Sequence, residues 1–106
     1  MALSRFLFFD ETSTEATSNA MKLHDLADTV TLQVEGDDVD LTIQGIVDVE
    51  NGEYANIGAI KMSNYSTVSS ISSSGVYLIP ATGIYYMRLV NNGAVGSVRA
   101  YVVSTR

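Results

Sequence analysis

Short runs of alternating apolar and polar residues dominate the chain from Val30 onward. Val30, Leu32 and Val34 are separated by polar residues, and residues 41–48 repeat the pattern, with Ile46 alone interrupting the polar row. A two-residue period is typical of strands that bury one face. The sequence therefore predicts β-structure over most of its length.

Turn residues separate these runs. Residues 35–38 (Glu-Gly-Asp-Asp) end the first run, and Asn51-Gly52 and Asn92-Gly93 favour type I′ hairpin turns because both residue types tolerate positive φ. Further strands are predicted at residues 53–62, 65–71, 75–79, 84–90 and 97–103. About seven or eight strands at this spacing predict an all-β fold, an antiparallel β-sandwich or jelly roll.

The first 27 residues differ from the rest. A short apolar run is followed by small polar residues with no strand pattern. We predict that residues 1–27 are an N-terminal arm, or an edge strand with a polar loop, attached to a sandwich domain of residues 28–106. A short helix over residues 14–24 is an alternative for the loop, because Ala, Met, Lys and Leu favour one.

All three phenylalanines of the chain, Phe6, Phe8 and Phe9, lie in this segment. Successive residues of a strand point to opposite faces, so these rings point both ways and one face must be covered. Either the segment is a central strand, or it docks onto a neighbouring subunit with these rings as interface residues. In the second case, a chain lacking its first 20 residues would keep the sandwich but no longer assemble.

Tyr85 and Tyr86 are the most informative of the six tyrosines. As neighbours on one strand they should face opposite sides, one in the core and one outward. The outward ring is a candidate for a protein interface or a ligand site.

Composition narrows the classes of function. The net charge is −6 and the 6 basic residues are scattered, which argues against a nucleic-acid partner. With no Cys and a single His, His24, the chain has no disulfide or Cys/His metal site. We interpret His24 as a surface or interface residue. Nucleophile and phosphate-loop motifs are absent as well, so we expect no enzyme.

The acidic turn is the one metal candidate. Asp37, Asp38 and Asp40, next to Glu35, offer hard oxygen ligands of the kind Ca²⁺ prefers. Their spacing departs from the EF-hand pattern, and a solvated turn that protects a sheet edge explains them as well. We therefore expect no cofactor and keep Ca²⁺ as an alternative.

No stretch approaches the ~20 apolar residues of a membrane span, and residues 6–9 are too short for a signal-peptide core. The expectation is a protein made in a cytoplasm, without a membrane partner.

Six segments share one style, in which aliphatic strands are interrupted by Gly, Asn-Gly and Gly-x-Tyr. They are Val30–Gly36, Leu41–Asp48, Asn51–Gly58, Gly75–Pro80, Gly83–Val90 and Gly96–Val102. In this pattern the chain resembles small β-sandwich structural proteins of tailed bacteriophages. The N-terminal 27 residues lie outside the resemblance.

The resemblance implies a virion protein, foremost a capsid decoration or cement protein that binds the shell and stabilises it. Its partner would be the major capsid protein or another virion protein, and it would act as a homo-oligomer, with a trimer implied by decoration proteins at three-fold sites. The alternative is a carbohydrate-binding or receptor-binding module at a fibre or tail tip.

Overall fold

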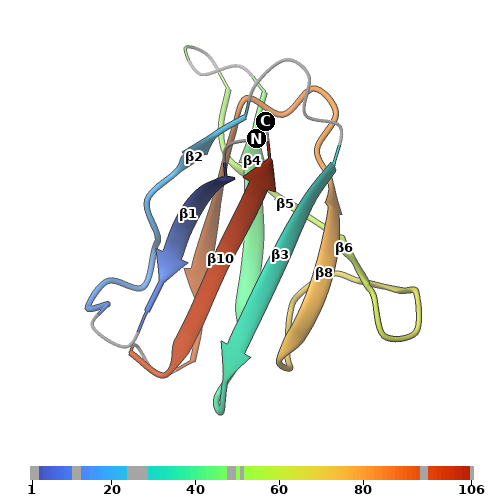
Figure 1. Cartoon of the computed structure of the whole chain (residues 1–106). Helices are drawn as coiled ribbons and strands as arrows, with labels where there is room; N and C mark the ends of the chain where they lie inside the picture. Colours follow the sequence, from blue (N-terminus) through green and yellow to red (C-terminus); the bar gives the residue numbers. More distant parts are fainter. Residues whose placement is uncertain are drawn as a thin grey trace.

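Two antiparallel sheets face each other in the computed structural model of the chain (Figure 1). The structure describes residues 3–10, 13–23, 29–47, 50, 52–93 and 96–105, and the side chains of all of these except 3–5 and 103–105. Within these ranges the chain forms ten strands and no helix.

Sheet A has six strands, in the order β1 (Leu3–Phe9), β10 (Val98–Thr105), β3 (Thr29–Gly36), β8 (Gly75–Pro80), β6 (Ala59–Lys61) and β7 (Ser66–Val68). Sheet B has four strands, in the order β2 (Met21–Lys22), β9 (Tyr86–Asn91), β4 (Leu41–Ile46) and β5 (Ala55–Ile57). The prediction of an all-β antiparallel sandwich is confirmed, although this strand order does not by itself establish a jelly roll.

Alternation along the strands builds the core. In β3, Val30, Leu32 and Val34 are buried while Thr29 and Thr31 are exposed. The inward rows of both sheets join in one apolar cluster. Tyr77 is the largest side chain in it, and its hydroxyl donates a hydrogen bond to the Ser73 carbonyl oxygen (2.8 Å). The ring is therefore buried without leaving its polar atom unsatisfied.

The predicted strand over residues 53–62 is in fact two strands in different sheets. β5 ends at Ile57 in sheet B, and β6 begins at Ala59 in sheet A, with Gly58 between them. An apolar pattern records which residues are buried but not which sheet buries them. The sequence pattern therefore could not predict that the chain passes from sheet B to sheet A at Gly58.

Neither Asn-Gly pair joins its strands as a two-residue hairpin turn. β9 and β10 lie in different sheets, and neither Asn92 nor Gly93 has positive φ. The connection crosses between the sheets, so it does not need the twist of a type I′ turn. Asn51 lies outside the described residues, and residues 47–54 separate β4 from β5, which is too long for such a turn.

The N-terminal strand β1 is an edge strand of sheet A, paired with β10. Leu7 lies opposite Tyr101 and Phe9 lies opposite Ala100, so Phe8 is an extra residue and forms a β-bulge. A bulge breaks the two-residue alternation, and Phe8 and Phe9 are both buried, at 5% and 2% exposure. This aromatic pair fills the core of its own chain.

Residues 13–23, here called the strap, lead from the edge of sheet A to the edge of sheet B (Figure 1). Two backbone hydrogen bonds hold the strap to β9, Asn91 N to Ala16 O (2.7 Å) and Ser18 N to Leu89 O (2.9 Å), and a third, Leu23 N to Tyr85 O (2.8 Å), joins it to the residue before β9. The helix considered for residues 14–24 is therefore wrong over its described part. Pairing with the edge of β9 satisfies backbone groups of both segments.

His24 and the predicted boundary between residues 27 and 28 lie outside the described residues. In the part of the chain that is described, no helix is long and apolar enough to cross a membrane.

Candidate interaction surfaces

The outer face of sheet B carries aromatic and polar side chains. Met87 and Leu89 of β9 point into the core, so Tyr86, Arg88 and Val90 point outward. On β4, Gln44 lies opposite Arg88 and continues the outward row. These cross-strand partners place unlike polar groups side by side on an accessible face.

Arg88 is held in place from two sides. Its Nε donates a hydrogen bond to Gln44 Oε1 (2.8 Å), and Gln44 Nε2 donates in turn to Asn56 Oδ1 on β5 (3.3 Å). The guanidinium carbon lies 3.7 Å from the centroid of the Tyr54 ring, a cation–π contact. We call Tyr54, Arg88, Gln44 and Asn56 the arginine clamp.

Tyr85 and Tyr86 lie beside the clamp and contact each other edge to face, with ring centroids 5.0 Å apart. Lys22 of β2 lies opposite Tyr86, and its Nζ is 5.4 Å from the centroid of the Tyr85 ring. Neither ring belongs to the core cluster, so the predicted division into one inward and one outward ring is wrong. Tyr85 precedes β9, and strand alternation therefore does not apply to it.

The outer face of sheet A carries exposed aliphatic side chains. One row crosses four strands, because Leu7 pairs with Tyr101, Tyr101 with Gln33, and Gln33 with Val76. Leu7 and Val76 are exposed, at 40% and 37%. We call these four residues the sheet A row, and it has the aromatic and aliphatic character of many protein interfaces.

The three phenylalanines proposed from sequence as interface residues occupy different environments. Phe8 and Phe9 are buried, whereas Phe6 is half-buried with its ring centroid 4.8 Å from that of Phe8. Buried rings offer a partner little surface in this fold. Among the described side chains of β1, Leu7 is the one that faces outward most.

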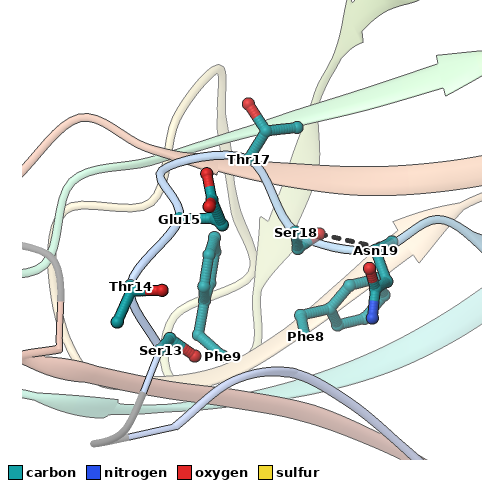
Figure 2. Close-up of a pocket in the computed structure, with 8 residues that line it drawn as sticks. All are labelled: Phe8, Phe9, Ser13, Thr14, Glu15, Thr17, Ser18 and Asn19. Atoms are coloured by element: carbon teal, nitrogen blue, oxygen red, sulfur yellow. Dashed lines mark hydrogen bonds between the residues drawn. The ribbon is translucent and has the colours of Figure 1, made fainter.

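A depression of about 160 Å³ lies between the strap and these rings. Figure 2 shows Phe8 and Phe9 on one side and the strap residues around them, including Ser13, Glu15 and Asn19. Ser18 fixes the strap here, because its Oγ accepts a hydrogen bond from Leu89 N and donates one to Asn19 O, both 2.9 Å. The depression therefore lies where the strap packs against the core.

The acidic turn does not gather its carboxylates. Asp37, Asp38 and Asp40 are all exposed, and no group of three His, Cys, Asp or Glu among the described residues is placed to hold a metal ion. The backbone of Asp38 instead lies close to Gly93. A Cβ placed on Gly93 would lie only 2.8 Å from the Asp38 carbonyl oxygen. The acidic turn therefore packs against the segment that follows β9.

Sequence reasoning missed the arginine clamp. Alternation in β4 and β9 places Gln44 and Arg88 outward, so the sequence pattern predicts the outward direction of both side chains. Their pairing depends on the register between two strands that lie far apart in the chain, which no local signal gives.

Comparison with known proteins finds similarity in structure alone. No family model matches the chain, and no curated protein matches it in sequence. Two solved structures are similar to it. One is the SPBc2 prophage-derived protein YomS, which is 17% identical in sequence and has a TM-score of 0.71. The match covers 97% of this chain and 94% of YomS.

The second is the PBSX exported protein XepA, with 16% identity and a TM-score of 0.79. This chain is covered over 97% of its length but spans only 38% of XepA. At such low identities, these likenesses establish a shared fold.

Proposed function

We propose that the chain is a structural component of a tailed-phage particle, a capsid decoration or cement protein that binds the major capsid protein or another virion protein. The observation that carries the proposal is the match of 97% of the chain to two solved structures, one of them a protein named as prophage-derived. One of the two is named an exported protein. On this proposal the chain is made in the host cytoplasm and ends in the virion.

The chain would act by binding and not by catalysis. The sheet A row would bury apolar surface between copies, in a homo-oligomer that we take to be a trimer. Several weak contacts made at once by an oligomer give a strong total attachment. Such a protein stabilises a shell by linking neighbouring subunits.

Add-back to bare particles tests this proposal. Particles are prepared from the encoding phage with the gene deleted, purified chain is added, and unbound chain is removed on a density gradient. We expect the chain to band with the particles and to raise the temperature at which they release DNA. Chain that stays at the top of the gradient would refute a decoration role.

Leu7→Glu combined with Val76→Glu is the informative variant, because it places charge in the sheet A row. Thr14→Glu combined with Asn19→Glu, on two exposed strap residues, is the matched control for added charge. We expect the double variant to lose particle binding and the control to keep it.

A second candidate is a carbohydrate-binding or receptor-binding module at a fibre or tail tip. The arginine clamp favours it, because an aromatic ring beside amide and guanidinium groups suits the apolar face and the hydroxyls of a sugar. Detection of the chain at the tail tip by immunogold labelling would favour this candidate over a shell protein.

A further inference from the structure

The arginine clamp holds a positive charge ready for an external anion. Gln44 occupies the Nε–H of Arg88, while the four N–H groups on its two terminal nitrogens remain. Among the described residues the contacts of Arg88 are those with Gln44 and Tyr54, and no carboxylate pairs with it. A guanidinium fixed in this way loses little conformational entropy when it binds a ligand.

Lys22 adds a second positive charge to the same face. It lies opposite Tyr86, and Arg88 is the next outward residue of β9, so the two cations are diagonal neighbours across the strand pair. The whole chain carries a net charge of −6. An acidic ligand is therefore repelled by most of the molecule and attracted to this face.

The surroundings suit sugar rings. Tyr54, Tyr85 and Tyr86 present aromatic surface beside the charges, and Asn56 is exposed next to them. Asn56 also lines an open groove of about 450 Å³ that runs between β5 and β7, past Gly58 and Thr67. The face thus continues into a hollow that can accept further residues of a polymer.

We propose that this face binds an anionic glycan, a sugar polymer that carries carboxylate or phosphate groups. The terminal nitrogens of Arg88 donate hydrogen bonds to the anionic group, and the positive charge of Lys22 attracts it. The tyrosines and Asn56 contact the sugar. This inference deepens the second candidate function, and it names the class of ligand for that module.

Binding of defined polymers tests the inference. The probes are oligogalacturonate for carboxylate, phosphorylated galactan for phosphate, and neutral galactan as the uncharged comparison, measured by calorimetry with the full chain. We expect one or both acidic probes to bind, weakening as salt is raised, and galactan to bind at least about 10-fold more weakly, as loss of a charge-assisted contact implies.

The variants separate a shaped site from general attraction. Arg88→Ala should weaken acidic binding by about 10-fold or more, and Arg88→Lys should recover only part of it, because Lys keeps the charge but lacks the planar fork. Arg99→Ala removes the same charge from sheet A, where Arg99 stacks on Tyr101 (5.0 Å to its centroid), and should leave affinity within about 2-fold. Unchanged unfolding midpoints confirm that the variants fold.

Three results would overturn the inference in different ways. Equal binding of galactan would leave a carbohydrate module without acid selectivity. An equal loss in Arg99→Ala and Arg88→Ala would show general electrostatic attraction. Absence of binding to all three probes would reject the carbohydrate module together with the inference, while leaving the particle-binding proposal to its own test.

Discussion

At the scale of single residues, the bulge in β1 decides what the N-terminal phenylalanines do. Phe8 and Phe9 are adjacent and both buried, which a regular strand forbids. The sequence showed three clustered aromatic residues but gave no sign of the bulge, because a bulge is set by pairing with β10. Simple alternation therefore left a docking arm, an edge strand and a central strand as open alternatives, and in the structure β1 lies at the edge of sheet A.

Phe9→Ala should destabilise the isolated chain strongly. The ring is 2% exposed, and its removal leaves a cavity in the core, which costs about 3–5 kcal/mol. Leu7→Ala, at an exposed site two residues earlier, should cost less than about 1 kcal/mol. Urea unfolding followed by fluorescence measures both. If Phe9→Ala unfolds at the wild-type midpoint, the core role of this residue is wrong.

Gly36 is the second residue on which the fold depends. Its φ is +154°, and a Cβ there would lie 2.5 Å from the Ser97 carbonyl oxygen. We expect Gly36→Ala to cost about 2 kcal/mol or more, from backbone strain and the clash together. Gly83→Ala is the matched control, because φ is +85° but no atom lies within 4 Å, so only strain of about 1–2 kcal/mol applies. Equal losses in thermal unfolding would argue against the clash.

At the scale of elements, the alternating pattern located most strands. The runs around β3, β4, β8, β9 and β10 were predicted close to their observed bounds, because each buries one face against the same core. The strap and β2 within it were predicted only as a polar loop or arm, since small polar residues carry no periodic signal. This segment is extended because its backbone pairs with the edge of β9, a tertiary contact that local sequence does not predict.

Removal of residues 1–20 tests the role of the N-terminal segment. The sequence had suggested that the sandwich survives this truncation, but the structure indicates the opposite. The truncation deletes Phe8 and Phe9 and uncovers the edges of β10 and β9. Uncovered edges promote aggregation. We expect a chain that is insoluble or lacks a cooperative unfolding transition; a soluble chain with the wild-type midpoint would contradict this account.

At the scale of the whole molecule, two sheet faces of different character point away from a shared core. The sheet A row exposes two aliphatic side chains, Leu7 and Val76, and the sheet B face carries the arginine clamp. Composition and alternation indicated that the chain presents binding surfaces. They did not show which side chains meet on each face, because these contacts join strands distant in sequence.

Self-association is the property that we expect of the sheet A row. Sedimentation of the wild-type chain should give an oligomer, three copies on our proposal, and Leu7→Glu with Val76→Glu should give the monomer because charge in an apolar interface is costly to bury. Arg88→Ala, on the other sheet, should sediment like the wild type. A wild-type monomer at all concentrations tested would remove the basis for an oligomer.

The most direct test of the central claim is the number of copies of this chain in purified phage particles, measured by quantitative mass spectrometry against the major capsid protein. A decoration protein occupies many equivalent sites, so we expect a fixed ratio with many copies per particle, retained through repeated gradient purification. Loss of the chain from the particles, with all of it recovered in the soluble lysate, would contradict the account.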